Sequence, residues 1–251
     1  MQDKTNSIYG IDISHYNDVD DWQAVKDSGV NFVYCKATQG TNLVDSKFAS
    51  FVKGAKEAGI PIGAYHFADL GDPVDEANHF LSVIDQYDLD LLPVLDLEKS
   101  TKDTDLEQWA RTFISTVNQK VMLYTGNWYI DQYSINGLSE IPLWTSYYKN
   151  TPPYDCGGWT EWTIWQYSET GSVEGITGDV DLDVAVSLDS ILIKGEEKQM
   201  NTTEKVIVNV KGKEIQGFII NGVSFIGTRE IVEALGLTIS YDDKNKVVVV
   251  K

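Results

Sequence analysis

The sequence predicts an α/β barrel of eight strands, and the spacing of its apolar segments is the main reason. Strand-like apolar runs begin near Ile8, Phe32, Ile62, Leu92 and Val121, at intervals of 24 to 30 residues, about the length of a strand-plus-helix unit. Three later strand-like runs follow without a long amphipathic helix between them. Alternating strands and helices favour a parallel sheet covered by helices. An open doubly wound sheet is the alternative, although no glycine-rich phosphate loop follows the first strand.

The first three predicted helices have acidic residues where a helix would begin. We expect the first helix to begin at Asp20 or Asp21 and the second at Asp45. The third should begin at Asp72, because an N-cap aspartate followed by a proline, here Pro73, is typical of a helix start. Gly29 and Gly59 follow the ends of the first two helices.

The fourth predicted helix begins at Asp103 or Thr104 and is the last with a clear helical period. Glu76 on the third helix and Glu107 on the fourth are expected on surfaces outside the barrel. The later strands are expected at residues 141–148, 162–167 and 180–184. The apolar positions of the fourth helix are Leu106, Trp109, Phe113 and Val117.

A second, small β-rich α+β domain is predicted at the C-terminus. The charged run at residues 194–198 indicates a linker over 191–203, between domains at 1–190 and 204–251. Asn221–Gly222 is a strong hairpin signal, and Thr228 would begin a short helix that ends at Leu235. The expected strands are residues 206–210, 215–220, 223–226 and 247–250.

The charge is strongly negative and unevenly distributed. The net charge is −18; residues 1–200 have 32 acidic and 13 basic side chains, and residues 201–251 have 6 and 7. A protein of this sign is not expected to bind nucleic acid unspecifically. No apolar run approaches the roughly 20 residues that cross a bilayer. Residues 1–6 lack a secretory segment, so we expect synthesis without a signal peptide.

Two carboxylates lie at the end of the fourth predicted strand. Strand alternation places Asp96 and Glu98 on one face, with Cα atoms roughly 6.6 Å apart, and directs Leu95 and Leu97 towards the helices. Active sites of α/β barrels lie at the carboxyl ends of the strands. Cleavage of a glycosidic bond needs such a pair, one acid to protonate the leaving oxygen and one carboxylate for the cationic sugar. The alternative is a pair of helix-capping residues.

Two further acids are expected at the same rim. Asp12 ends the first strand, and Asp181 lies in the last strand, which should close against the first. Four acids at one rim would raise the pKa of at least one by like-charge repulsion, as a general acid near neutrality requires. A solvated acidic turn or a calcium loop at 179–183 is the alternative, although the spacing does not fit an EF-hand.

Aromatic residues near the strand ends fit a saccharide groove, because sugar rings have apolar faces that stack on flat side chains. Each aromatic alone is more often a core residue, but together with four acids they favour a carbohydrate ligand. They are Tyr65, Tyr124, Trp144, Tyr148, Trp165 and Tyr167.

Two other functional classes remain open. His15 and His66 follow the first and third strands and, with Asp96, could bind zinc for amide hydrolysis in a peptidoglycan amidase or deacetylase. A non-catalytic saccharide-binding barrel is the other, although it would not need both acids. A cysteine nucleophile is disfavoured because Cys35 lies in a buried strand and Cys156 in a loop.

Seven short motifs, in order along residues 7–186, resemble the family 25 glycoside hydrolases, which are lysozyme-like muramidases. The resemblance implies a TIM-like barrel of five βα units and three further strands. It implies hydrolysis of the β-1,4 bond between N-acetylmuramic acid and N-acetylglucosamine in peptidoglycan. Because four carboxylates explain the site, we expect no metal and no other cofactor. The motifs are residues 10–14, 36–38, 64–67, 96–98, 124–126, 165–167 and 180–182.

The resemblance also implies roles for individual residues. Glu98 would be the general acid and Asp96 the carboxylate that stabilises the reacting sugar. Asp12 and Asp181 would complete the acidic rim, and Lys36, Gln166 and the aromatic residues above would bind substrate. The chain departs from the family where Gln39 replaces a more usual glutamate and where Ser146 replaces a small apolar residue. Val94 replaces the aspartate that a family 18 chitinase would need.

The C-terminal segment more loosely resembles copper amine oxidase N-terminal-like modules of cell-wall-associated proteins. This implies that residues 204–251 bind a polymer of the Gram-positive wall. Together the two parts are similar to a phage endolysin, which stays in the host cytoplasm until the membrane is opened. Initiation at Met200 would produce a free wall-binding domain, which could form a homo-oligomer with the full-length chain.

Overall fold

The computed structural model describes residues 8–193, 204–210, 213–220, 223–226, 232, 235–236, 239–242 and 247–250. The chain divides into two compact units, Met1–Ile193 and Lys194–Lys251, each of which is described by itself. Residues 191–193, which the sequence placed in the linker, are part of the first unit: Ile191 is buried, and Leu192 pairs with Leu91.

Eight strands of the first unit form a closed barrel, as predicted. Seven are parallel, and β11 runs antiparallel to both β9 and β1; the parallel pairing of β1 with β3 then closes the sheet. Two short strands, β2 (Asp18–Val19) and β10 (Ile176–Thr177), pair with each other, and β4 (Leu43–Val44) pairs with the end of β3. The barrel strands are β1 (Ile8–Ile13), β3 (Phe32–Gln39), β5 (Ile62–Phe67), β6 (Val94–Asp96), β7 (Met122–Gly126), β8 (Leu143–Ser146), β9 (Ile164–Gly171) and β11 (Val180–Ala185).

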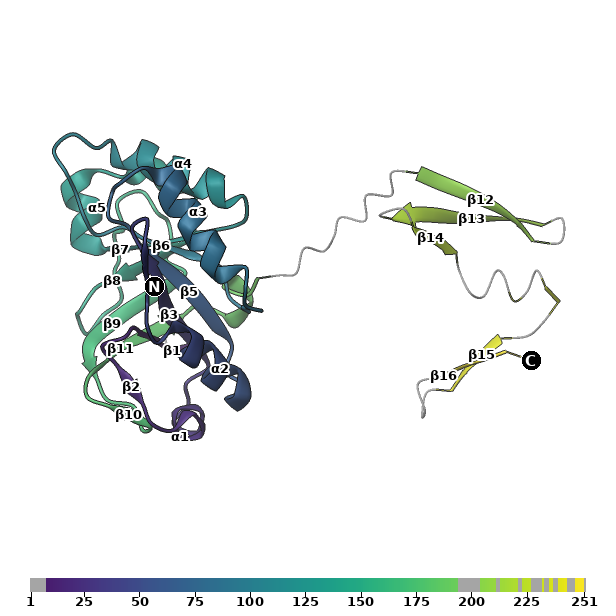
Figure 1. The fold of residues 1–251 in the computed structure, drawn as a ribbon, viewed down its shortest axis with the longest axis horizontal. Helices are drawn as coiled ribbons and strands as arrows, with labels where there is room; N and C mark the ends of the chain where they lie inside the picture. The colour runs from purple at the N-terminus through teal and green to yellow at the C-terminus, as the bar shows by residue number, and fades with distance from the viewer. Residues whose placement is uncertain are drawn as a thin grey trace. The chain divides into compact units, whose positions relative to one another are not determined.

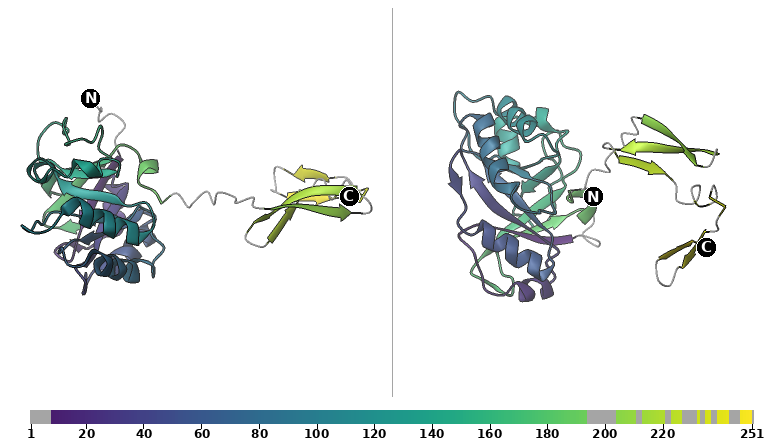
Figure 2. Two further views of the ribbon diagram at one scale, coloured as in Figure 1. Left: turned by 90° about the horizontal axis from the view of Figure 1, so that it is seen from above. Right: turned by 45° about the vertical axis from the view of Figure 1, so that its right-hand side comes forward.

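Five α-helices each follow one of the first five barrel strands, which confirms the predicted five βα units. They lie outside the strands, and α3 packs beside α4 (Figure 1; Figure 2 gives two further views). Short 3-10 helices occur at Asn136–Leu138 and Leu188–Ser190. The five helices are α1 (Trp22–Asp27), α2 (Phe48–Ala58), α3 (Pro73–Ile84), α4 (Leu106–Val117) and α5 (Asn127–Tyr133).

Side-chain caps confirm two predicted helix starts and correct two others. Asp21 accepts hydrogen bonds from two backbone N–H groups of α1, and Asp72 does the same for α3. The N-cap of α4 is Asp105 rather than Asp103 or Thr104, because only the Asp105 carboxylate reaches the backbone N–H of the third helical residue. The second helix begins later than predicted, since Asp45 holds the backbone N–H of Lys47, outside the helix.

Strand alternation divides the apolar core into two layers and directs the site residues. Val33 and Leu95 pack between the strands and the helices, whereas Tyr34 and Val94 fill the barrel interior. Asp96 therefore shares the interior face of β6 with Val94. Because the interior is filled below by large side chains, polar side chains at the carboxyl ends of the strands meet at the rim.

The second unit contains five described strands. Antiparallel pairing joins β12 to β13 and β13 to β14, while β15 pairs with β16. The predicted turn at Asn221–Gly222 and most of the predicted helix at 228–235 lie outside the described residues. None of the helices in the described parts of the chain is long and apolar enough to cross a membrane. The strands are β12 (Glu204–Val210), β13 (Lys213–Ile220), β14 (Val223–Ile226), β15 (Ile239–Asp242) and β16 (Val247–Val250).

Candidate active site

A cavity of about 220 Å³, here called the acid cavity, opens at the carboxyl ends of the barrel strands. All four predicted acids contribute to its lining. Ser14, Tyr16 and Phe67 also line it, although the sequence did not single them out. The predicted site residues that line it are Asp12, Lys36, Tyr65, Asp96, Glu98, Tyr124, Trp144, Gln166 and Asp181.

Asp96 and Glu98 lie on the same side of β6, as predicted. Asp96 is the last residue of the strand and is buried; its Oδ1 has no hydrogen-bond partner in the described structure. Glu98 follows the strand and is half-buried. Leu95 and Leu97 face the helices. One buried carboxyl group with a free oxygen therefore lies beside a second that is open to the cavity.

Gln166 connects Asp12 and Tyr124 of the cavity with Tyr148 beside it. Its Nε2 donates to Asp12 Oδ2 at 2.7 Å, and its Oε1 accepts from the hydroxyls of Tyr124 and Tyr148, each at 2.8 Å. The amide is thus fixed in orientation, and Asp12 is fixed by it. Tyr148 lies just outside the acid cavity, in an adjoining groove that also contains Glu98.

Asp183 is a fifth acid, which the sequence analysis did not select; it does not line the acid cavity but interacts with Asp12 and Asp181. In the antiparallel pairing of β1 with β11, Asp181 lies opposite Asp12, and Asp183 lies opposite Gly10. Asp183 is fully buried, and Trp144 Nε1 donates to its Oδ1 at 2.9 Å. The signal was present, because Asp181 and Asp183 alternate in the same way as Asp96 and Glu98.

The crowding of acids raises their pKa values. Burial, followed by the charges of Asp183 and Asp181, raises the pKa of Asp12 well above its usual value. The pKa of Asp96 is raised by burial and by Glu98. Burial and Asp181 raise the pKa of Glu98, while burial and Glu169 raise the pKa of Asp181 to about 6. A site with these groups retains protons at pH values where an exposed carboxyl group has lost them.

Lys36 brings a positive charge to the cavity. Its Nζ donates to Gln39 Oε1 at 2.6 Å and lies 4.6 Å from the ring centre of Phe67. Its charge lowers the pKa of Asp96, against the effects of burial and of Glu98. Gln39, the departure from the family noted above, also donates to Asp69 at 3.0 Å. Lys36 therefore favours the ionised form of Asp96.

Two of the expected aromatic residues lie elsewhere. Ile164 and Gln166 face into the barrel, so strand alternation turns Trp165 and Tyr167 to the outer side of β9. There Trp165 is fully buried, packs near Trp162, and donates from Nε1 to the carbonyl of Tyr147 at 2.7 Å. These two residues do not line the acid cavity.

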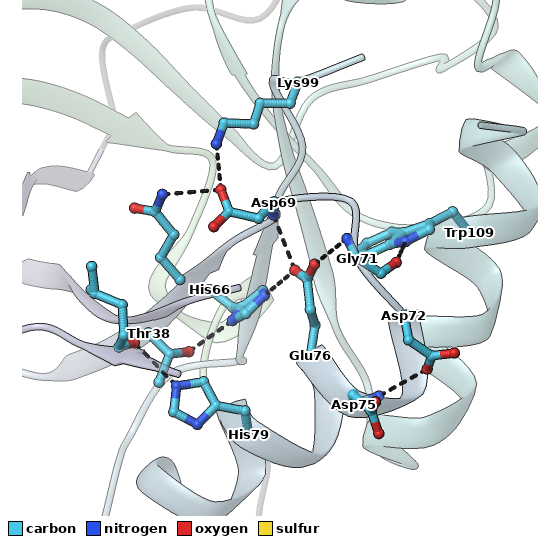
Figure 3. A network of polar contacts seen from close by, with 12 residues as sticks. Thr38, His66, Asp69, Gly71, Asp72, Asp75, Glu76, His79, Lys99 and Trp109 are labelled. Atoms are coloured by element: carbon cyan, nitrogen blue, oxygen red, sulfur yellow. Dashed lines mark hydrogen bonds and ion pairs between the residues drawn. The ribbon is translucent and has the colours of Figure 1, made fainter. Parts of the chain in front are cut away.

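His66 and Glu76 form a buried pair between the barrel and α3 (Figure 3). His66 Nε2 lies 2.9 Å from Glu76 Oε2, and His66 Nδ1 lies 2.7 Å from the Thr38 hydroxyl. Glu76 also accepts from the backbone N–H groups of Asp69 and Gly71. The expectation that Glu76 lies on the surface is therefore wrong. The loop before α3 folds over this residue, and the backbone N–H groups of the loop donate hydrogen bonds to its carboxylate.

These contacts argue against the zinc alternative. Both ring nitrogens of His66 have protein partners, and the ring packs against Phe80 and Phe113 of the helix-side core. His15 Nδ1 is paired with Asp45 at 2.8 Å. Within the described residues, no three histidine, cysteine or acidic side chains are grouped so that they could hold a metal ion. Cys35 and Cys156 are both buried thiols.

Comparison with known proteins decides the family. The model of glycosyl hydrolases family 25 matches residues 11–176. Lysozyme M1 of Streptomyces globisporus is 34% identical over 197 residues, which cover 70% of this chain and 67% of that protein. The chain belongs to glycosyl hydrolases family 25. It is a glycoside hydrolase of the lysozyme type.

Other family 25 members agree with this assignment. An autolytic lysozyme of Clostridium acetobutylicum is 37% identical over 180 residues, which cover 69% of this chain but only 54% of that protein. The crystal structure of a bacterial lysozyme from Streptomyces coelicolor matches with a TM-score of 0.65 and 32% identity, over 71% of this chain and 92% of that one. The family match ends at residue 176, so the positions of Asp181 and Asp183 in the site are given by the barrel geometry.

Proposed function

We propose that this family 25 enzyme hydrolyses the β-1,4 bond between N-acetylmuramic acid and N-acetylglucosamine, with Glu98 as the general acid. The observation that carries the proposal is the position of Glu98, half-buried beside Asp96 and open to the cavity. Burial and the charge of Asp181 raise its pKa. A glycosidic oxygen is a poor leaving group and must be protonated as its bond breaks.

The other acids of the cavity can stabilise the positive charge that develops on the sugar. As the bond to the anomeric carbon breaks, that sugar becomes positively charged. Asp96 has a buried oxygen without a protein partner, and Lys36 favours its ionised form. Asp12, held by Gln166, and Asp181 line the same cavity. The Glu98 proton passes to the bridging oxygen as the C–O bond breaks, water adds its hydroxyl to the anomeric carbon, and the remaining proton of that water returns to Glu98.

Digestion of purified cell walls tests the assignment of the bond. We expect every new reducing end, after reduction and mass spectrometry, to be N-acetylmuramic acid. New N-acetylglucosamine ends would indicate a glucosaminidase, and release of peptides without new reducing ends would indicate an amidase. The Glu98→Gln variant at the same protein concentration is the control for contaminating hydrolases.

We also propose that the second unit binds the wall. Its near-balanced charge supports this, since a Gram-positive surface is anionic and should repel the acidic barrel. A fluorescent fusion of residues 201–251 should label susceptible cells, and a fusion of residues 1–193, which keeps the whole first unit, should label them poorly. Equal labelling by the two fusions would contradict the proposal.

We also propose a more specific biological role, that of an endolysin. Such an enzyme acts on the wall of the cell that produces it, once the membrane of that cell has been opened. The pairing of a muramidase site with a separate unit of balanced charge supports this role. Expression inside a susceptible bacterium should leave the cells intact until a membrane-permeabilising protein is co-expressed. Lysis without that protein would favour an exported autolysin instead.

A further inference from the structure

A second groove meets the acid cavity at Glu98. It has a volume of about 490 Å³ and lies over the carboxyl ends of β7 and β8. We call it the Trp128 groove, after the residue that dominates it; Asn127, Trp128 and Tyr148 line it together with Glu98. Glu98 is a lining residue of both spaces. Glu98, the proposed general acid, therefore lies where the acid cavity and the Trp128 groove meet.

Trp128 offers a fixed aromatic face in this groove. The side chain is 56% exposed, which is unusual for a tryptophan, yet it is held on two sides. Its ring packs edge-on against Tyr129, with centroids 5.7 Å apart. Its Nε1 lies against Gly126, where an added Cβ would be only 2.4 Å away. A large aromatic surface left open but held in place suits stacking against the apolar face of a sugar.

Asn127 provides a polar group beside that face. Its Oδ1 is buried and has no hydrogen-bond partner in the described structure. Buried amide oxygens are normally paired, so an unpaired one at a groove needs an explanation. A hydroxyl or an amide N–H from a bound sugar would supply the missing donor. The groove thus combines an apolar platform with one unsatisfied acceptor.

The distribution of acids decides which sugar enters which compartment. Positive charge develops on the sugar whose anomeric carbon loses its oxygen. The buried acids Asp12 and Asp96 both line the acid cavity, whereas Asp131 and Glu169, the acids that line the Trp128 groove besides Glu98, are exposed to solvent. The anomeric sugar therefore belongs in the acid cavity. With the bridging oxygen at Glu98, the next sugar of the strand is directed into the groove.

We propose that the Trp128 groove binds the leaving sugar, a 2-acetamido sugar that stacks on Trp128 and donates a hydrogen bond to Asn127 Oδ1. This rests on the proposed function, because it takes Glu98 as the acid. The C–O bond breaks on the anomeric side, so the bridging oxygen leaves with this sugar as its hydroxyl group. In the proposed reaction the leaving sugar is N-acetylglucosamine.

The test is steady-state hydrolysis of soluble, peptide-free glycan strands by the full-length chain. Trp128→Ala should raise KM about tenfold, as truncation of a key contact aromatic does, with kcat changed less. An interaction made equally before and during bond breaking acts mainly on KM. Trp128→Phe should recover most of the affinity. The matched control is Tyr154→Ala, whose side chain is 93% exposed in a separate pocket and should not affect KM.

A second pair of variants tests the polar contact. Asn127→Ala should raise KM severalfold without lowering the unfolding temperature, because its oxygen has no protein partner to lose. Gly126→Ala should mimic Trp128→Ala by displacing the indole.

The two proposals fail separately. If Trp128→Ala and Asn127→Ala both hydrolyse strands with the wild-type KM while Glu98→Gln is inactive, the leaving sugar lies elsewhere and the acid assignment stands. If Glu98→Gln is active, the proposed function itself is overturned.

Discussion

Trp144 donates its indole N–H to the buried carboxyl group of Asp183 at 2.9 Å, across the interior of the barrel. The second oxygen of Asp183, Oδ2, is buried without a hydrogen-bond partner within the described residues. Burial and the charge of Asp181 raise the pKa of Asp183 well above its usual value. The folded protein therefore binds a proton at this group more tightly than the unfolded chain does.

The raised pKa of Asp183 predicts how the unfolding free energy depends on pH. With its pKa raised on folding, Asp183 contributes stability that is present below about pH 4 and is lost as the pH rises through the folded pKa. Asp183→Asn keeps an acceptor for Trp144 and cannot ionise. We expect a smaller fall in unfolding free energy between pH 4 and pH 8 than in wild type, measured by urea denaturation. A parallel pH dependence in both proteins would show that Asp183 does not titrate.

Glu98→Gln should abolish most of the activity. Glutamine keeps the shape of the side chain but has no acidic proton, and general acid catalysis typically contributes about 10²–10⁴-fold. We expect at least a hundredfold fall in the rate of wall hydrolysis, with wall binding in a pull-down assay unchanged. Asp96→Asn should also be severe, because the developing positive charge loses its partner. Lysis at a near wild-type rate by Glu98→Gln would show that Glu98 is not the general acid.

Asp181→Asn should move the alkaline limit of activity. Asp181 has a pKa of about 6, and its negative charge raises the pKa of Glu98. Without that charge, Glu98 should lose its proton at lower pH. We expect the alkaline limb of the kcat/KM profile to shift towards acid. An unchanged limb in a variant that retains measurable activity would mean that another group sets it.

Glu76→Ala should destabilise the barrel unit. The substitution leaves the His66 ring and two backbone N–H groups without their acceptor, and each buried unpaired group costs about 1–3 kcal/mol. We expect a loss of more than about 2 kcal/mol in denaturant unfolding. Glu57→Ala is the control, since that side chain is 69% exposed and makes only a surface ion pair at 3.9 Å. Equal losses in the two variants would contradict the buried role.

The order of strands and helices could be predicted from the sequence because apolar spacing and helix caps are local signals. The alternation of side chains along a β-strand also placed Asp96 and Glu98 correctly on one face. Trp165 and Tyr167 were misplaced because a family motif gives residue types in order, whereas the side of the strand depends on register. On β9, Gln166 faces inward and its two neighbours therefore do not.

The partners of two buried acids could not be predicted from the sequence. Glu76 has the spacing of the buried face of α3, four residues before Phe80, but the sequence did not show that the His66 ring and the backbone of residues 69–71 supply its partners. Asp183 shows the alternation of a rim acid, but its partner Trp144 is 39 residues away in the chain. Neither contact has a local signature.

The antiparallel strand β11 has a consequence for synthesis on the ribosome. Asp12 lies in the first strand of the barrel, and Asp181, which faces it, lies in the last, between β1 and β9. A nascent chain therefore has three of its four rim acids, and lacks Asp181, until β11 has emerged and inserted. Chains that stop before that strand should be harmless to the cell that makes them, because the last barrel strand to be translated also completes the catalytic rim.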